Sequence, residues 1–194
     1  KTAYAVKTNG ERQVLDVLAA NGVTCFDVAS PQEIADVRAA APKAEMIYMH
    51  PVKAQSHIRD ALHRDKIRTL ALDHEDELTK IHRIVQALDI DPGSVTLYVR
   101  LQTKGHAAYE LSKKFGAGPS HAVELLQRVE RLGYKAGLCF HVGSQIEDPE
   151  TYDAALKVAK QVRDSSGVKL AGLDIGGGFP AEYGHDPKRA HAEM

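Results

Sequence analysis

The stretch RTLALDHEDELTKIHRIVQALDIDPGSVTLYVRL, residues 68–101, carries the pattern that decides the fold. Two short runs rich in strand-forming residues, 68–73 and 95–101, flank an amphipathic segment. In that segment the apolar residues recur at helical spacing, at Leu78, Ile81, Ile84, Val85 and Leu88. A strand, a helix and a second strand in this order predict two parallel strands with the helix covering one face.

The same alternation runs along the whole chain of 194 residues. The other predicted strands are 3–6, 24–29, 45–50, 135–142 and 169–175. Further helical patterns run over Val14–Leu18, Val123–Leu132 and Tyr152–Val162, and Ser30 with Glu33 forms a capping box before Ile34 and Val37. Because no linker or low-complexity tract interrupts the alternation, we expect one α/β domain.

Two architectures fit this alternation, a doubly wound open sheet and a (β/α)8 TIM barrel, and the regular repeats favour the barrel. A barrel needs eight strands and about 250 residues, whereas residues 1–194 show seven strands. We therefore expect residues 1–194 to be a (β/α)8 barrel domain that is truncated at both ends. An open barrel leaves unpaired strand edges, so we expect such a fragment to be unstable alone.

The composition excludes several classes of protein. Charged residues make up 26% of the chain, the formal net charge is -1, and Lys and Arg are spread evenly, so no nucleic acid or membrane partner is expected. No apolar run approaches the roughly 20 residues of a membrane span. Cys25 and Cys139 lie in strand-like segments and are read as buried free thiols of a cytoplasmic protein. Neither the histidines nor the cysteines show metal-ligand spacing, so no metal site is expected.

Polar or glycine residues follow each predicted strand. They are Lys7, Asp27, His50, Asp73, Arg100, His141 with Ser144, and Asp174 with Gly176, Gly177 and Gly178. A single residue of this kind is more often a solvated turn residue than part of a site. In a barrel, however, the carboxyl ends of the strands meet at one rim, where active sites lie. The group as a whole therefore predicts a site.

The residue types at this rim indicate a particular chemistry. Lys7, anchored by a buried strand, can act as a nucleophile towards an aldehyde, although taken alone it reads better as a surface lysine. The glycines at 176–178 can bring backbone amides close to a phosphate, or can simply form a tight turn. Gly143 and Ser144, on the neighbouring strand, can join the same cradle. The ring of His141 can lie against a flat cofactor or can be a hydrogen-bonded strand-end histidine. Together these features describe a pyridoxal phosphate site.

Five motifs also carry a family resemblance: YAVKTN, FDVAS, KKFGA, FHVGSQ and LDIGGGFP, in this order and over nearly the whole chain. With them the sequence resembles the pyridoxal-phosphate-dependent decarboxylases of the alanine racemase fold, the group that holds ornithine, arginine and diaminopimelate decarboxylases. FHVGS and DIGGGFP look most like the ornithine decarboxylase branch. The pattern at the sixth and seventh strands differs from that of a racemase or of a single-domain pyridoxal phosphate carrier.

The resemblance implies a role for individual positions. Lys7 matches the catalytic lysine that holds the cofactor as a Schiff base, and His141 matches the histidine stacked on its ring. Asp27 and Arg100 match residues beside the cofactor. The matches to the phosphate ligands are Ser144, Gly176, Gly177 and Gly178. Residues 102–113 match a loop over the active site.

The resemblance also implies an activity: decarboxylation of a basic amino acid, with L-ornithine to putrescine, a step of polyamine biosynthesis, as the first expectation. Lysine, arginine and diaminopimelate decarboxylases are alternatives, as is a regulatory homologue that has lost catalysis. Such homologues usually lose the lysine or the phosphate ligands, which this sequence keeps. The family works as a homodimer, with a glutamate-proline-glycine motif on the eighth strand and a second β-rich domain. Neither occurs in this sequence, so we expect residues 1–194 alone to be inactive.

Overall fold

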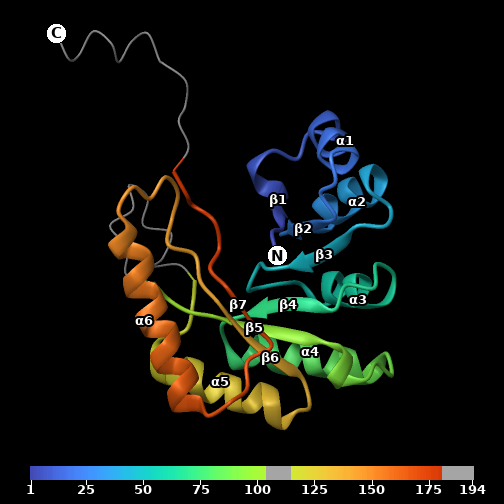
Figure 1. The fold of residues 1–194 in the computed structure, drawn as a ribbon. Helices are drawn as coiled ribbons and strands as arrows, with labels where there is room; N and C mark the ends of the chain where they lie inside the picture. The colour runs from blue at the N-terminus through green and yellow to red at the C-terminus, as the bar shows by residue number, and fades with distance from the viewer. Residues whose placement is uncertain (104–114, 181–194) are drawn as a thin grey trace, which may run out of the picture.

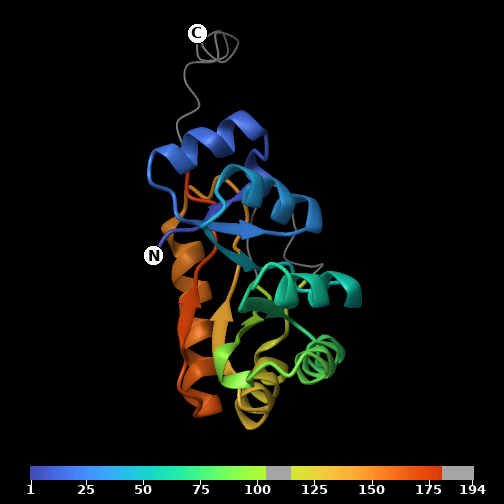
Figure 2. The same cartoon turned by 90° about the vertical axis from the view of Figure 1, so that its right-hand side faces the viewer.

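The structure, a computed structural model, describes residues 1–103 and 115–180. Seven parallel strands form one sheet in the order β1 to β7, so each strand pairs with the strands before and after it in the chain. The sheet curls, and the helices lie along its outer face (Figures 1 and 2). The strands are β1 (Tyr4–Ala5), β2 (Cys25–Val28), β3 (Glu45–Tyr48), β4 (Thr69–Leu72), β5 (Thr96–Arg100), β6 (Lys135–Cys139) and β7 (Gly172–Asp174).

A helix follows each strand from β2 to β6, and α1 follows β1 after one short 3-10 turn. The α-helices are α1 (Arg12–Ala20), α2 (Pro31–Ala40), α3 (Gln55–His63), α4 (Glu75–Ala87), α5 (Pro119–Arg131) and α6 (Pro149–Ser166). The 3-10 turns are η1 (Val6–Thr8) and η2 (Pro92–Ser94). In the described residues every strand belongs to this one sheet, which confirms the expected incomplete (β/α)8 barrel.

The core lies between the sheet and the helices. Successive side chains of a strand point to opposite faces of a sheet, and in β2 to β6 one set is buried against the helices. These residues are Phe26, Val28, Met46, Tyr48, Leu70, Leu72, Leu97, Val99 and Leu138. The alternate set, which includes Asp27, Tyr98 and Arg100, faces the concave side of the sheet, where a cavity lies. The two-residue period thus separates packing from the site.

The predicted capping box at the start of α2 is confirmed, with one difference. The Ser30 hydroxyl accepts a hydrogen bond from the Glu33 amide at 3.2 Å. The Glu33 carboxylate reaches back one residue further than usual and accepts from the Ala29 amide at 2.7 Å. The cap therefore also fixes the chain between β2 and α2, directly after Asp27.

A buried ion pair ties the β3–α3 connection to α4. The Lys53 ammonium lies 3.0 Å from the Glu77 carboxylate, and the two side chains are 0% and 3% exposed. Lys53 also donates to the carbonyl oxygens of His50 at 2.9 Å and Ala71 at 2.6 Å. The Glu77 carboxylate is shared with Lys80 at 2.5 Å. Burial lowers the pKa of Lys53, while Glu77 opposes that shift.

Several strand bounds and one helix need correction. The strands expected at 3–6, 45–50 and 135–142 end earlier, at Ala5, Tyr48 and Cys139, where the chain leaves the ladder at the rim, and the strand expected at 169–175 begins only at Gly172. Helix α3 was not predicted, since only Ile58, Ala61 and Leu62 are buried in it and one of these is a small alanine. Cys25 and Cys139 are buried free cysteines, as expected. No helix among the described residues has the length and apolar character that crossing a membrane requires.

Candidate functional site

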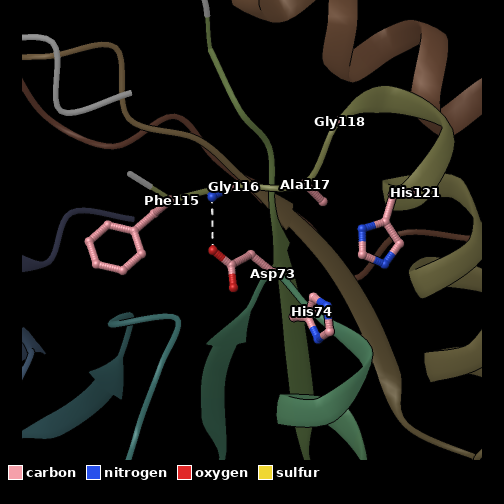
Figure 3. A pocket seen from close by; sticks show the side chains of 7 residues that line it. All are labelled: Asp73, His74, Phe115, Gly116, Ala117, Gly118 and His121. Atoms are coloured by element: carbon pink, nitrogen blue, oxygen red, sulfur yellow. Dashed lines mark hydrogen bonds between the residues drawn. The ribbon is translucent and has the colours of Figure 1, made fainter. Parts of the chain in front are cut away.

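A cavity of about 650 Å³ opens on the concave side of the sheet and reaches the carboxyl ends of the strands. The predicted residues that line it are Lys7, Asp27, Arg100, His141, Ser144, Asp174 and Gly176 to Gly178. Two strand-end residues expected at this rim lie elsewhere. Asp73 lines a separate cavity of about 230 Å³ (Figure 3), and the ring of His50 packs edge-on against Phe115.

The three glycines after β7 form a turn that packs against the chain after β6. Gly176 and Gly178 have φ angles of +69° and +100°, which side-chain-bearing residues rarely adopt. A β-carbon on Gly176 would lie 2.6 Å from the Phe140 carbonyl oxygen, and one on Gly178 would lie 2.0 Å from that of Gly143. A β-carbon on Gly177 would meet nothing within 4 Å. Gly177 therefore has open space beside it in the wall of the cavity.

The hydrogen-bond donors of this turn fit an anion such as a phosphate. The Gly176 amide already donates to the Asp174 carboxylate at 2.8 Å, so it holds the turn itself. The amides of Gly177 and Gly178 make no hydrogen bond within residues 1–103 and 115–180, and Ser144 is exposed at the cavity wall. Consecutive free amides with a nearby hydroxyl form an anion-binding concavity.

His141 is a neutral ring at the edge of the cavity. Burial, followed by the positive charges of Lys7 and Arg100, lowers the pKa of His141 to about 4. At neutral pH the imidazole is therefore uncharged, which suits contact with the face of an aromatic ring. The Thr103 hydroxyl donates to the His141 carbonyl oxygen at 2.9 Å and fixes the backbone there.

Lys7 and Arg100 bring positive charge to the same cavity from different strands. Lys7 lies in η1 and its side chain is exposed on the cavity side. Arg100 ends β5, and its guanidinium carbon lies 5.6 Å from the centre of the Phe115 ring, within cation–π range. Both residues act on the pKa of His141, so the cavity combines two cations with a neutral imidazole.

Asp27 is the carboxyl group whose acidity the site changes most among those described. Burial first, and then the neighbouring charge of Asp174, raise the pKa of Asp27 to about 7, while Lys7 and a hydrogen bond from the Met49 backbone oppose the shift. Asp27 can therefore hold or release a proton near neutral pH. A carboxyl group with this property in a cavity is typical of functional sites.

Sequence reasoning missed a second layer of residues deeper in the cavity. Cys25, Tyr98, Cys139 and Gly172 all line it, and each precedes a predicted site residue by two positions. Because residues two apart share a face of a strand, this spacing could have identified them. Burial raises the pKa of the Cys139 thiol, so the thiol stays protonated.

Two expectations concern segments or ions rather than the cavity wall. Of the predicted loop at residues 102–113, only Gln102 and Thr103 are described, and residues 104–113 lie outside the described part of the chain. Among the described residues, no group of three or more His, Cys, Asp or Glu side chains is placed to hold a metal ion.

Comparison with known families identifies this arrangement. The family described as "Pyridoxal-dependent decarboxylase, pyridoxal binding domain" matches residues 1–194. The chain belongs to this family. Pyridoxal phosphate is therefore the cofactor of the domain, and the resemblance carried by the five motifs is confirmed.

Relatives within the family share between a third and two fifths of the sequence. The chain is 35% identical over 183 residues to a lysine/ornithine decarboxylase of Selenomonas ruminantium, covering 91% of this chain and 44% of that protein. It is 38% identical over 183 residues to ornithine decarboxylase of Mus musculus, covering 91% of this chain and 38% of that protein. The chain thus spans less than half the length of these curated relatives.

Solved structures of decarboxylases have the same fold. A mutant of SrLDC in complex with PLP superposes with a TM-score of 0.80 at 35% identity, over 92% of this chain and 46% of the other. A lysine/ornithine decarboxylase from Vibrio vulnificus complexed with cadaverine gives a TM-score of 0.76 at 32% identity, over 93% and 47% of the two chains. The incomplete barrel is therefore a decarboxylase-type barrel.

Proposed function

We propose that residues 1–194 form the cofactor-binding barrel domain of a pyridoxal-phosphate-dependent decarboxylase of basic amino acids, with L-ornithine as the first substrate to test. The observation that carries this proposal is the convergence of Lys7, His141 and the Gly177–Gly178 amides on one cavity. A nucleophilic amine, a flat neutral ring and an anion cradle are the three contacts that this cofactor needs.

The described residues divide the binding of the cofactor between them. The Lys7 amine would bond to its aldehyde carbon, and the neutral His141 imidazole would lie against its ring. Ser144 and the amides of Gly177 and Gly178 would hold its phosphate, while Gly176 keeps the turn closed through Asp174. When bound, pyridoxal phosphate accepts the electron pair that remains after a substrate carboxylate leaves as carbon dioxide.

Asp27 and Arg100 would set the charge around the cofactor. With a pKa of about 7, Asp27 can hold a proton at its carboxyl oxygen or give it up during turnover. Arg100 supplies a fixed positive charge at the same rim. The curled sheet and the helices outside it exclude water from one side of the site.

Support for a basic amino acid as substrate comes from the relatives. Their names include ornithine and lysine/ornithine decarboxylases, and the Vibrio vulnificus enzyme was crystallised with cadaverine and with putrescine. An arginine decarboxylase and a diaminopimelate decarboxylase are also structural neighbours. The cavity residues described above position the cofactor, so the choice among these substrates is a matter for measurement.

We further propose that the complete protein is a cytoplasmic homodimer that binds neither nucleic acid nor membranes. The two free buried thiols, Cys25 and Cys139, support a reducing compartment. The net charge of -1 supports the absence of a polyanionic partner. Light scattering on the purified complete protein tests the dimer, and a monomeric mass would refute it.

The cofactor assignment is tested by trapping. The complete protein, purified with pyridoxal phosphate, should show the visible absorbance of the lysine-bound cofactor, and borohydride should fix the cofactor on a peptide containing Lys7. Lys7→Ala should abolish this labelling. Lys1→Ala is a matched control, because Lys1 is another exposed lysine that lines the same cavity. Labelling that survives Lys7→Ala but is lost in Lys1→Ala would refute the assignment.

The reaction is tested separately by carbon dioxide release from L-ornithine, L-lysine, L-arginine and diaminopimelate. We expect release from at least one basic amino acid, with ornithine the fastest. A protein that binds the cofactor on Lys7 but releases carbon dioxide from none of the four substrates would instead be a regulatory homologue.

A further inference from the structure

The second cavity lies beside β4 and α5, and Asp73 is at its centre (Figure 3). Asp73 follows β4 directly, and its carboxylate accepts a hydrogen bond from the Gly116 amide at 2.8 Å. In Figure 3, Phe115 lies on one side of this bond, and His74 and His121 lie on the other. Asp73 does not line the large cavity that contains Lys7 and His141, so it has no direct access to the cofactor site.

The chain around Gly116 is pressed against the end of β5. The Ala117 amide donates to the Arg100 carbonyl at 2.8 Å, and the Gln102 amide donates to the Ala117 carbonyl at 2.9 Å. Gly116 has a φ angle of +107°, and a β-carbon there would lie 2.5 Å from the Gln102 nitrogen. Only glycine fits this position, which fixes the backbone of Gly116 directly beside the strand that carries Arg100.

Phe115 then connects this backbone to the Arg100 side chain. The guanidinium carbon of Arg100 lies 5.6 Å from the Phe115 ring centre. The Phe115 ring also packs edge-on against His50, with 5.4 Å between the ring centres and 72° between the planes. His50 is itself held, because its carbonyl accepts from the buried Lys53 ammonium. The Phe115 ring is therefore held between His50 and the Arg100 side chain.

We propose that Asp73 is a positioning residue for the cofactor site, which sets the side chain of Arg100 beside His141 through Gly116 and Phe115. The inference rests on the proposed function, since the cofactor gives the position of Arg100 its purpose. A carboxylate suits this task because hydrogen bonds to charged acceptors are shorter and stronger than those between neutral groups. Removal of the acceptor would free the Gly116 amide and, with it, the Phe115 ring.

The first test reads the position of Arg100 without the cofactor. In the complete protein freed of pyridoxal phosphate, the His141 ring is titrated by nuclear magnetic resonance. Arg100 is one of the two cations that lower the His141 pKa, so Arg100→Gln should raise it, by about half a pH unit for a cation several ångströms away. Asp73→Ala should raise it too. Direct loss of the Asp73 negative charge would instead lower the His141 pKa, so the sign separates the two effects.

Two further variants make the test specific. Asp73→Asn keeps an oxygen that can accept from Gly116 but loses the charge, so it should not raise the His141 pKa, which should equal that of the wild type or lie slightly below it. In an Arg100→Gln background, Asp73→Ala should cause no additional rise, because residues that act in one chain of contacts are not additive. An unchanged His141 pKa in Asp73→Ala would overturn the proposal, and so would an unchanged His141 pKa in Arg100→Gln. A further rise in the double variant would also overturn it.

Phe115→Leu allows the same test if Asp73→Ala folds poorly. It keeps apolar volume but removes the aromatic face, so it should also raise the His141 pKa when Arg100 is present and have no effect when Arg100 is Gln. An unchanged His141 pKa in Phe115→Leu would overturn the proposal as well.

The second test uses the cofactor. The dissociation constant of pyridoxal phosphate, from an absorbance titration, should rise about fivefold in Asp73→Ala and in Phe115→Leu, as expected for loss of one cation–π contact, and stay near wild type in Asp73→Asn. An unchanged dissociation constant in both Asp73→Ala and Phe115→Leu would count against the proposal. If the wild-type protein bound no pyridoxal phosphate, the proposed function would fail, and the His141 titration would still decide whether Asp73 positions Arg100.

Discussion

Gly178 lies directly against Gly143: a β-carbon on Gly178 would be only 2.0 Å from the Gly143 carbonyl oxygen. The loops after β6 and β7 thus meet backbone to backbone. The contact is reinforced next to it, where the Ile146 amide donates to the Gly178 carbonyl at 2.8 Å. Gly143 and Gly178, both expected to help form the phosphate cradle, therefore also allow the two loops to pack this closely.

Gly177 and Gly178 are predicted to respond differently to alanine. Gly178→Ala would force a backbone shift and a strained φ angle of +100°, so it should lower the free energy of unfolding by about 1–3 kcal/mol. Gly177→Ala meets no atom within 4 Å and should leave stability within about 0.5 kcal/mol of wild type, while its methyl group weakens pyridoxal phosphate binding. Urea denaturation of the cofactor-free protein and a cofactor titration measure the two effects. Equal stability losses in both variants would contradict the glycine geometry.

The raised pKa of Asp27 predicts a pH-dependent stability. A carboxyl group with a folded-state pKa of about 7 binds its proton more tightly in the folded protein than in the unfolded chain. Its stabilising contribution is therefore complete below about pH 4 and is lost as the pH rises through about 7. Relative to wild type, Asp27→Asn should become more stable as the pH increases from 5 to 8. Urea denaturation of the cofactor-free protein at both pH values measures this difference.

Asp174→Asn provides the control for that prediction. It removes the second cause of the shift but leaves the first, burial, so it should reduce the pH dependence without abolishing it. A stability difference between Asp27→Asn and wild type that is the same at pH 5 and pH 8 would show that Asp27 has an ordinary acidity.

Because the Lys53–Glu77 pair is buried, replacement of only one partner should strongly lower the free energy of unfolding. Glu77→Gln leaves the Lys53 ammonium buried beside carbonyl oxygens alone and should cost about 3–5 kcal/mol of unfolding free energy. Lys53→Met with Glu77→Met should recover part of this loss, because no fully buried charge is stranded; Lys80, which also loses its partner, is partly exposed. Recovery should be incomplete, since the His50 and Ala71 carbonyls lose their donor.

Asp153→Ala is the surface control for this experiment. Its contact with Lys157 is 4.0 Å long, and both side chains are mostly exposed, so the change should be within about 0.5 kcal/mol. A loss in Glu77→Gln no larger than in Asp153→Ala would contradict the burial of the pair.

The contact of Gly172 with Tyr98 predicts that loss of the Tyr98 hydroxyl restores the stability that Gly172→Ala removes. A β-carbon on Gly172 would lie 2.4 Å from the Tyr98 hydroxyl but 3.5 Å from the nearest ring carbon. Gly172→Ala should therefore destabilise the wild type by about 1 kcal/mol or more and be nearly neutral together with Tyr98→Phe. Gly137→Ala should not be rescued in this way, because its β-carbon would meet ring carbons at 2.7 Å. Thermal denaturation of the four variants checks the difference.

The sheet was predictable because each strand repeats one simple rule. Apolar runs such as 68–73 and 95–101 alternate with amphipathic segments, and the alternation alone predicts parallel pairing. Helix α3 was not predicted because its buried face is narrow and partly made of alanine. The ends of β1 and β6 were predicted too late in the chain because the residues that follow each strand are also apolar.

The sequence predicted the site residues that lie at strand ends. It did not predict side-chain positions that depend on contacts between residues far apart in the chain. Lys7, Asp27 and His141 reach the same cavity through strand order alone. Asp73 follows a predicted strand just as Asp27 does, but its carboxylate accepts a hydrogen bond from Gly116, 43 positions away in the chain. A pairing across that separation leaves no local signal. The acidity of Asp27 was equally hidden, because it depends on burial and on Asp174.

The order of the sheet has a consequence for how the protein is made. Since β1 to β7 pair strictly in the order of synthesis, each of β2 to β7 finds a partner already present at the edge of the growing sheet. Assembly on the ribosome can therefore advance one strand–helix unit at a time from the N-terminus. Lys7, which follows β1, would therefore be in place well before His141 and the glycine turn, which follow β6 and β7.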